Sequence, residues 1–524
     1  MTRTRRFVGG VSVTYTHQVA VTVVGLWLTP FLLSHLGAFQ YGLWLTATQL
    51  IAYLTLLDLG VLALLPRDAA CATGGDAAQT ERELPEIIAR ASWIVLWQMP
   101  LIAAATVVAW WSLPAGWQDL QKPLALVLAA FVLTYPLRIF QATLQGLQDL
   151  AFVGGLQLGA WAAGTAVAIA LVLGGYGLLA VAIGALLTQL ISLTGCATRV
   201  FARFPAAVPR TLQPHSWPAV RPYLQRAGWV SGGQVAQILL NSTDILLVAW
   251  FFGPVTVVPY ACTQKLISVL ANQPQVLTQA AAPALSQLRT GATREKLFAV
   301  TSSLSLALMV VSGGVVILVV ALNRAFVSWW VGPDQYGGAL LTGLFATAML
   351  LRHWNTALTY SLFSFGFERR LSVTTVGDGL VSFGLALMLA RTIGVVGVPI
   401  GFIAGALIVS LPANLVALGR ATGVAPAHFA LSLSPWAVRL AALVPIAAAV
   451  NLFLPPDSVV VLGLAAVGIG VAYVALMMPV AIRPPLGDYV TPFLSRLPWS
   501  PATGSGRRAA ERRTRLRRGY GGQA

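Results

Sequence analysis

Long apolar stretches recur along the whole chain, separated by short breaks rich in glycine, proline or polar residues. Each stretch matches the ~20 residues that a helix needs to cross a hydrocarbon core of ~30 Å. The pattern predicts fourteen membrane-spanning helices, at residues 8–33, 41–65, 92–113, 124–146, 151–174, 176–198, 227–251, 254–280, 298–322, 338–362, 371–390, 393–417, 435–454 and 458–482.

The composition agrees with this pattern, since 57% of the 524 residues are hydrophobic and only 9% are charged. Soluble proteins average about 25% charged residues. The basic N-terminus leads into a long apolar helix without a cleavage site, so we expect an uncleaved first span. The three cysteines are scattered and predict neither a disulfide framework nor a metal site. The sequence therefore predicts an all-α polytopic membrane protein.

The net charge of +17 reflects topology rather than nucleic-acid binding. Segments on the predicted cytoplasmic side hold 26 of the 33 Lys and Arg residues, whereas the opposite loops hold three. The positive-inside rule then places both termini in the cytoplasm. The basic tail "RRAAERRTRLRR" (Arg507–Arg518) is interpreted as a topology signal or as a segment that adheres to anionic lipid headgroups.

Two segments indicate an internal repeat. "HLGAFQYGLWLTATQLI" (His35–Ile51) aligns with "FFGPVTVVPYACTQKLI" (Phe251–Ile267) at an offset of 216, with Gly37 over Gly253. Gly146 and Gly177 align with Gly366 and Gly397 at an offset of 220. Because six helices per repeat is an even number, we expect two parallel lobes related by an axis along the membrane normal. The predicted organisation is an N-terminal six-helix lobe (1–211), a C-terminal six-helix lobe (212–424), two additional helices (425–484) and a basic cytoplasmic tail (485–524).

A few ionisable residues fall inside the predicted spans. Placing such groups in the hydrocarbon core costs free energy, so their side chains must face protein or water. The candidates for headgroup or cavity contacts are His17, Arg138, Lys265 and Arg352, and the candidate switch or coupling carboxylates are Asp58, Asp244 and Asp378.

Each acidic residue has a basic residue at a similar predicted depth. Asp58 and Arg138 lie roughly 10 Å from the cytoplasmic ends of their helices, which predicts an interhelical pair or a switch. Lys265 lies at a depth similar to that of Asp244, and we interpret Lys265 and Arg352 as cations for an anionic headgroup. His17, in the polar "THQ" of the first helix, is either cavity-facing or a hydrogen-bonded interior histidine.

Several motifs carry a resemblance to a known family. "LSHLGAFQYGLWLTATQLIAYLTLLDLGVLALLPRDAA" and "STDILLVAWFFGPVTVVPYACTQKLI" resemble the first two helices and the opening of the second lobe of the polysaccharide-precursor (O-antigen and exopolysaccharide, Wzx-like) flippases. These belong to the multidrug/oligosaccharidyl-lipid/polysaccharide (MOP) exporter superfamily. The resemblance covers roughly residues 8–420, and the two further helices also occur in the related lipid II flippases.

The resemblance implies a V-shaped, two-lobe transporter that works by alternating access. Its substrate would be a polyprenyl-diphosphate-linked oligosaccharide for surface polysaccharide biosynthesis, and its partners membrane lipids and polysaccharide polymerase or export machinery. The first helix lacks the arginine cluster of lipid II flippases, so Arg138, Lys265 and Arg352 would replace it by chemistry alone. No cofactor is expected; coupling to a proton, sodium or the membrane potential stays open. Arg outnumbers Lys 30 to 3, which favours the inner membrane of a bacterium with a GC-rich genome.

Three rival functions remain. A multidrug exporter of the same superfamily would use the three aspartates for cationic substrates. A membrane glycosyltransferase or polymerase needs large outer loops, and those predicted here are short, so we do not expect an enzyme. An ion or amino-acid symporter needs paired helix interruptions, of which "VSGGVV" is the only strong example.

Overall fold

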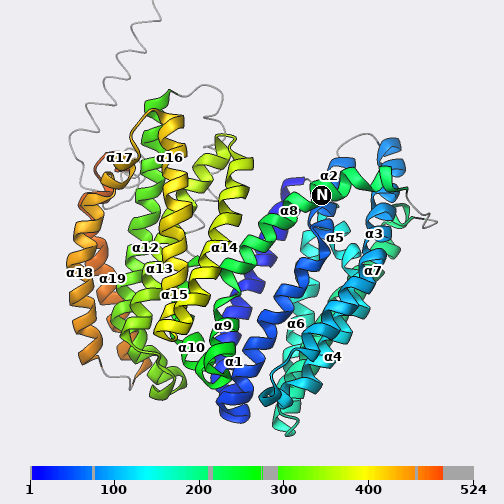
Figure 1. The fold of residues 1–524 in the computed structure, drawn as a ribbon, viewed down its shortest axis with the longest axis horizontal. Coiled ribbons are helices and arrows are strands. Elements are labelled where there is room, and N and C mark those ends of the chain that lie inside the picture. The colour runs from blue at the N-terminus through cyan, green and yellow to red at the C-terminus, as the bar shows by residue number, and fades with distance from the viewer. Residues whose placement is uncertain are drawn as a thin grey trace, which may run out of the picture.

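The computed structural model describes residues 3–73, 77–209, 216–272, 274, 293–454, 458–484 and 486–487. Every regular element in these ranges is helical (Figure 1). The first half (residues 3–209) contains α1 (Arg3–Leu54), η1 (Thr55–Asp58), α2 (Val61–Ala72), α3 (Ala77–Trp111), η2 (Ala115–Trp117), α4 (Gln118–Thr134), η3 (Tyr135–Leu137), α5 (Arg138–Gly146), α6 (Leu150–Leu173), α7 (Leu178–Arg203) and η4 (Pro205–Ala207).

The second half (residues 216–487) also has only helical regular elements in its described ranges. It contains α8 (Trp217–Asn241), α9 (Asp244–Phe252), α10 (Pro254–Leu270), α12 (Arg294–Val331), η6 (Pro333–Gln335), α13 (Ala339–Ser364), α14 (Glu368–Ile393), α15 (Gly397–Gly405), the π-helix η7 (Ala406–Ser410), α16 (Leu411–Thr422), α17 (Pro426–Leu431), α18 (Ser434–Phe453) and α19 (Val459–Ala481).

The all-α membrane fold predicted from the sequence is confirmed, but the count of fourteen spans is not established. Within the described ranges, ten helices are long and apolar enough to cross a membrane, or eleven if the bent pair α8–α9 is one span. The lobe boundary at 211/212, the end of the helix predicted at 254–280 and the basic tail after residue 487 lie outside the described residues.

The repeat at an offset of 216 is visible in the backbone. Gly37, where two helices merged in α1 meet at a kink, has φ 76° and ψ 166°. Gly253, between α9 and α10, has φ 84° and ψ 163°. An L-residue rarely adopts a positive φ, so both turns require glycine. The second predicted alignment is not reproduced in this way, because Gly366 has φ 92° whereas Gly146 continues α5.

Close glycine contacts join the last helix pair of each repeat. A methyl group on Gly164 of α6 would lie 2.4 Å from the carbonyl oxygen of Gly184 in α7. One on Gly401 of α15 would lie 2.3 Å from the Cα of Ala386 in α14. Small residues let membrane helices approach closely, where dispersion replaces the hydrophobic effect as the driving force.

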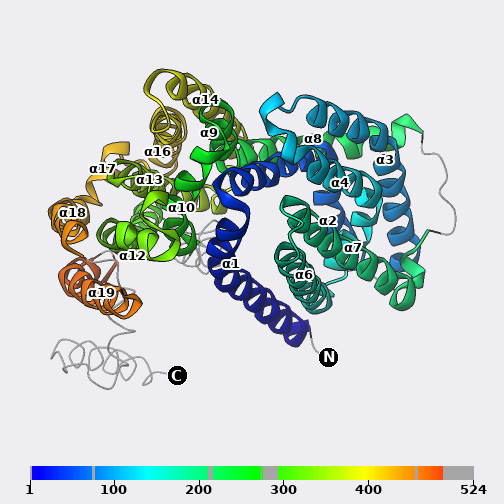
Figure 2. The ribbon, with the colours of Figure 1, turned by 90° about the horizontal axis from the view of Figure 1, so that it is seen from below.

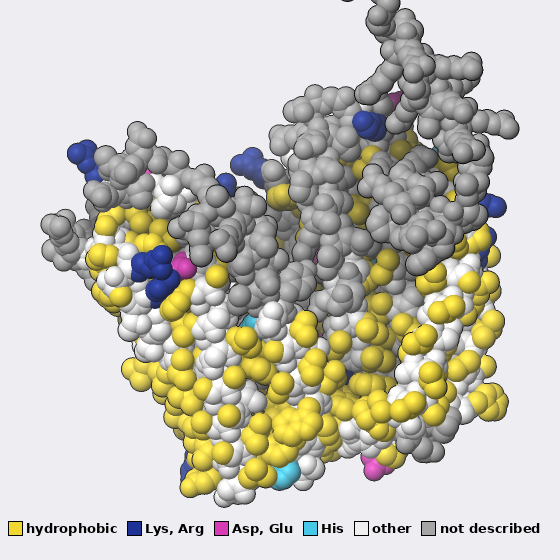
Figure 3. Space-filling model, turned by 180° about the vertical axis from the view of Figure 1, so that it is seen from behind, with side chains coloured by type: hydrophobic (Ala, Val, Ile, Leu, Met, Phe, Trp, Pro, Cys, Tyr) yellow, Lys and Arg dark blue, Asp and Glu magenta, His cyan; other side chains and the backbone are white. Residues whose placement is uncertain are grey.

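The surface fits a bilayer. Figure 3 shows hydrophobic side chains over much of one flank, with most of the visible Lys and Arg gathered toward one end, the basic end. Figure 2 places α18 and α19 on the outer side of α12, away from the first half. Tyr473 of α19 donates a hydrogen bond to the carbonyl oxygen of Val310 at 2.6 Å, which fixes this pair against α12.

The two halves diverge toward the basic end and converge at the opposite end (Figure 1). At the converging end a methyl group on Gly42 of α1 would lie 1.9 Å from the carbonyl oxygen of Pro254 in α10. Trp330 Nε1 donates a hydrogen bond to the carbonyl oxygen of Leu26 at 2.6 Å. The halves are thus in backbone contact away from the basic end.

Candidate functional site

Three adjoining cavities lie along α8. A cavity of 640 Å³ is enclosed by second-half helices, one of 510 Å³ lies between η1 and α8, α13 and α14, and one of 440 Å³ lies mainly in the first half. Gln237 lines the first two and Gln234 the last two. We call these the second-half, central and first-half cavities. Together they form a path from one half of the molecule to the other, which is polar in the two end cavities and largely apolar in the central cavity, where Gln234 and Gln237 lie in the wall. We call it the polar path.

Asp58 stands at a helix break that borders the first-half cavity. Leu59 and Gly60 have φ 48° and 75°, which ends η1 before α2 begins. Asp58 Oδ1 accepts a hydrogen bond from the Gly60 N–H at 2.7 Å, and Gln98 Nε2 donates to the Asp58 carbonyl oxygen at 3.1 Å. Irregular backbone at membrane depth is tolerated where it lines a cavity and its polar groups are paired. "LDLG" is therefore a stabilised helix break.

Arg138 lines the same cavity but does not pair directly with Asp58. Their side chains form none of the three ion pairs within 4 Å that the described residues make, so the predicted contact is not direct, although the two charges lie close enough to interact electrostatically. Arg138 lies over the rings of Phe131 and Tyr135, with Cζ 4.5 Å and 5.9 Å from their centroids. Within the described chain its guanidinium makes no hydrogen bond, so its N–H groups are available to a ligand.

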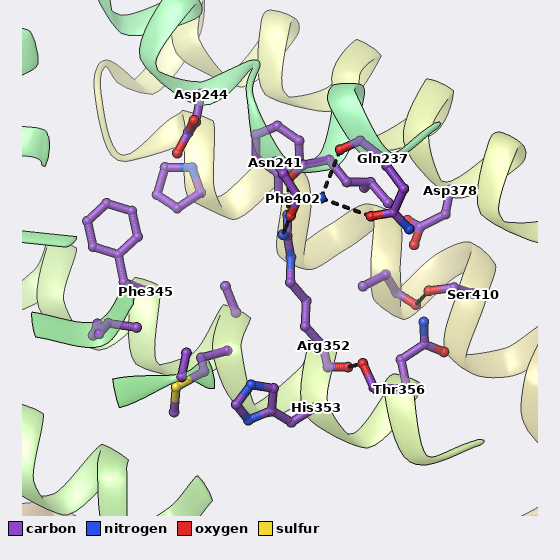
Figure 4. Close-up of a pocket in the computed structure, with 18 of the residues that line it drawn as sticks. Gln237, Asn241, Asp244, Phe345, Arg352, His353, Thr356, Asp378, Phe402 and Ser410 are labelled. Atoms are coloured by element: carbon purple, nitrogen blue, oxygen red, sulfur yellow. Dashed lines mark hydrogen bonds between the residues drawn. The ribbon is translucent and has the colours of Figure 1, made fainter. Parts of the chain in front are cut away.

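Arg352 crosses the second-half cavity from α13 to α8 (Figure 4). Its guanidinium donates to Asn241 Oδ1 at 2.8 Å and to the carbonyl oxygen of Leu240. It also lies 5.8 Å from the ring centroid of Phe402. Arg352 therefore lines the cavity, and two of its five N–H donors are bonded to α8.

Two of the predicted carboxylates line the second-half cavity with Arg352. Asp244 accepts hydrogen bonds from the Ile245 N–H at 2.9 Å and from Gln264 Nε2 at 3.2 Å. Asp378 is 5% exposed and accepts one from Ser382 Oγ at 3.0 Å. Depth alone suggested Lys265 for Asp244, whereas the cation that shares its cavity is Arg352.

Lys265 and His17 lie away from the three cavities. Lys265 is half-buried on α10 and is absent from the described walls of each cavity, although its neighbour Gln264 belongs to one. The ring of His17 packs edge-on against Trp161 of α6, with centroids 6.4 Å apart. The structure thus separates these two residues from the other five candidates.

The sequence interpretation missed the amide side chains of the cavities. Gln234, Gln237 and Asn241 follow one another at intervals of three and four on α8, so they share one face of the helix. Gln141 and Gln145 have the same relation in α5 and line the first-half cavity. This spacing of amides within apolar stretches was visible in the sequence, but the search for ionisable residues passed over it.

A fourth cavity, of 400 Å³, differs in character. It lies between α1, α3 and α4 on one side and α9 and α14 on the other, and its wall is almost entirely apolar, with Arg391 at the margin. Tyr53 and Thr243 line it and hydrogen-bond to each other across the two halves. The polar path and the apolar cavity therefore lie at different places along the interface between the halves.

The comparisons with known proteins agree with this architecture. Residues 92–334 match the model of a family described as polysaccharide biosynthesis protein. The fold resembles the lipid II flippase MurJ in an inward closed conformation, with a TM-score of 0.61, 9% identity, and coverage of 90% of this chain and 99% of that chain. It also resembles an inward-facing multidrug-resistance MATE transporter of the MOP superfamily, with a TM-score of 0.53, 15% identity, and coverage of 83% and 98%.

An outward-facing MATE transporter aligns with a TM-score of 0.52 and 16% identity over 79% of this chain and 96% of that chain. No curated protein matches the sequence. The family match spans the second-lobe motif at Ser242–Ile267 and agrees with the resemblance that this motif indicated, and the solved structures show a shared fold.

Proposed function

We propose that this chain is a MOP-type transporter of the polysaccharide-flippase kind, and that it flips a polyprenyl-diphosphate-linked oligosaccharide across a bacterial inner membrane; the partial family match and the shared fold support this. The headgroup moves through the polar path along α8, while the lipid chain stays in the bilayer. Alternating access exposes the path first to one side and then to the other, and the product feeds surface polysaccharide biosynthesis.

The polar path is the observation that carries this proposal. A lipid-linked sugar has a headgroup that cannot cross the hydrocarbon core unaided and a chain that needs no protein to remain in it. Two polar end cavities, connected through a central cavity whose wall includes the amides Gln234 and Gln237, supply a route for such a headgroup inside a molecule whose outer flank is apolar.

Arg138 is the residue best suited to the diphosphate. Guanidinium groups bind phosphate oxygens through two parallel N–H bonds. The Arg138 guanidinium is held over Phe131 at 4.5 Å, faces the first-half cavity and is free of protein hydrogen bonds among the described residues. Arg352, in contrast, is already bonded to α8. We therefore assign phosphate contact to Arg138 and a positioning role to Arg352.

The charge distribution supports one orientation. Arginines concentrate at the end where the halves diverge, and the positive-inside rule makes that end cytoplasmic. Because the halves are in contact at the other end, through Gly42 and Pro254, this conformation accepts substrate from the cytoplasm. Its counterpart would break those contacts and open the path outward.

Flipping in proteoliposomes tests the proposal. The purified chain is reconstituted with a fluorescent prenyl-diphosphate disaccharide, and transfer between leaflets is followed by quenching from outside. We expect Arg138→Gln to slow flipping about tenfold or more, through the lost charge-assisted bonds. Arg138→Lys should retain part of the activity, and Arg391→Gln, at an exposed arginine outside the described walls of the polar path, should match wild type. No acceleration over protein-free vesicles would contradict the proposal.

A multidrug exporter is the second candidate, because Asp58, Asp244 and Asp378 all line the polar path. Carboxylates inside a transport cavity suit cationic substrates. Efflux of a lipophilic cationic dye from the same vesicles separates the two functions. A drug exporter would move the dye and keep doing so in Arg138→Gln, whereas a flippase would leave the dye in place.

A further inference from the structure

The second-half cavity is lined by an unusual density of neutral hydrogen-bonding groups. Seven hydroxyl side chains line it, together with six side-chain amides: Gln237, Asn241, Gln264, Asn272, Asn355 and Asn414. An amide presents donors and an acceptor in one plane, and a sugar hydroxyl is both donor and acceptor. At 640 Å³ the cavity falls within the ~300–1,000 Å³ of drug-sized ligand sites, enough for more than one sugar ring.

One amide of this cavity has an acceptor without a partner. Asn414 is 2% exposed, and its Nδ2 donates to Asn355 Oδ1 at 2.8 Å. Its Oδ1 has no hydrogen-bond partner in the described part of the chain. A buried acceptor that lacks a donor is costly. Asn414 belongs to the wall of this cavity, and a small rotation of its side chain would present Oδ1 to a ligand hydroxyl.

The ionisable side chains that line the cavity have a formal charge of −1, counting His353 as neutral. Asp244 and Asp378 oppose a single cation, Arg352, whose guanidinium is directed to Asn241 and to the Leu240 carbonyl oxygen. Asp378 forms no ion pair among the described residues, and Ser382 occupies only one of its carboxylate oxygens. A ligand carboxylate placed here would meet like charge in a site of low dielectric, where repulsion is strong.

We propose that the second-half cavity binds sugar rings of the headgroup, and that it selects neutral or amine-bearing rings against acidic ones. This inference rests on the proposed flippase function and assigns its substrate class. Asn414 and the other amides bond ring hydroxyls. Asp378 accepts a hydroxyl or an ammonium group and repels a uronate. The diphosphate lies at Arg138, in the first-half cavity, at the other end of the path along α8.

Equilibrium binding tests the assignment without requiring transport. The full-length protein in lipid nanodiscs is titrated with three synthetic ligands: prenyl diphosphate alone, prenyl diphosphate with a neutral disaccharide, and prenyl diphosphate with a disaccharide that ends in a uronate. In wild type we expect the neutral disaccharide to bind about tenfold more tightly than the uronate. Asp378→Asn, which keeps the acceptor for Ser382, should bring the two Kd values to within about twofold.

Two further variants make the result specific to this cavity. Asn414→Leu should weaken the neutral disaccharide while leaving the Kd of prenyl diphosphate unchanged. Asp334→Asn, at an exposed position in η6, should preserve the wild-type ratio and thus controls for a general change in charge.

The remaining outcomes separate this inference from the function on which it rests. Equal binding of neutral and uronate ligands to wild type would overturn the selection against acidic rings. Disaccharides that bind no more tightly than prenyl diphosphate would overturn the placement of sugars in this cavity, with the flippase function intact. Failure of prenyl diphosphate itself to bind would contradict the proposed function.

Discussion

Arg352 of α13 donates a hydrogen bond to Oδ1 of Asn241, in the last turn of α8, at 2.8 Å. At its other end α8 is attached to the first half, where Tyr223 Oη donates to the Val61 carbonyl oxygen at 3.1 Å. The break between α8 and α9 bends by 51° immediately after Asn241. The helix that carries the amides of the polar path is therefore held by both halves, and a movement of either half displaces those amides.

Removing the hydrogen bonds that Arg352 donates to α8 should destabilise the attachment of α8 to the second half. In Arg352→Gln the Asn241 and Leu240 oxygens lose a charged donor, and a hydrogen bond to a charged group typically contributes about 2 kcal/mol. We expect the melting temperature of the purified protein to fall by several degrees and flipping to slow. Thermal melting in detergent measures the first effect. Arg391→Gln removes an exposed arginine and should leave melting unchanged; equal melting of the two variants would contradict the positioning role.

The carboxylate of Asp58 should act mainly through the helix break. Asn can also accept the Gly60 N–H, so Asp58→Asn should melt and flip close to wild type. Asp58→Ala removes the acceptor and should cost about 1 kcal/mol, as loss of a helix cap does. If Asp58→Asn folds but fails to flip, the charge itself is required. In that case, rescue by adding Arg138→Gln would indicate charge compensation, and no rescue would indicate proton coupling.

The contact between Gly42 and Pro254 should hold the path closed at its outer end. A methyl group at position 42 would lie 1.9 Å from the Pro254 carbonyl oxygen, so Gly42→Ala should shift the population toward outward-open states. A cysteine at Thr359, where the central and second-half cavities meet, reports this shift through labelling by an impermeant thiol reagent from outside, in a Cys71→Ser background.

The matched control is Gly25→Ala, because a methyl group there meets nothing within 4 Å. Labelling should increase several-fold in Gly42→Ala and stay at the wild-type level in Gly25→Ala. Equal labelling of the two variants would show that the contact at Gly42 does not hold the outer end closed.

The ion pair between Arg226 and Asp68, at 2.5 Å, should stabilise the state with α8 docked on α2. Arg226 is 58% exposed, so the pair contributes at most about 1 kcal/mol. Asp68→Arg and Arg226→Asp should each change the flipping rate up to about fivefold. The double exchange should restore the rate if attraction between the two side chains is the cause. Two single variants with wild-type rates would show that this pair does not limit transport.

The sequence predicted those features that depend on composition and local conformation. Apolar length gave the helical membrane fold, and the paired glycines at 37 and 253 marked two turns of nearly the same φ and ψ. Charge distribution identified the basic end. Each of these features depends on a single segment or on an average over the chain, so it can be predicted without knowing how the helices pack.

The sequence could not predict which side chains face one another. Depth along a helix does not define the direction around it, so Asp58 and Arg138 reach one cavity without forming an ion pair, and Lys265 points away from the cavity that Gln264 lines. The partners of Arg352 were missed for a different reason: an amide oxygen and a carbonyl oxygen carry no formal charge. Only ionisable residues were considered as candidate site residues, and the amides on α8 were left out.

The distribution of the lipid-linked glycan between the two leaflets tests the central claim most directly. Cells depleted of this protein are complemented with wild type, Arg138→Gln or Arg391→Gln, and the glycan exposed on each leaflet is quantified. The account predicts cytoplasmic accumulation and loss of surface polysaccharide after depletion and with Arg138→Gln, and normal export with wild type and Arg391→Gln. An unchanged leaflet distribution with intact surface polysaccharide after depletion would contradict it.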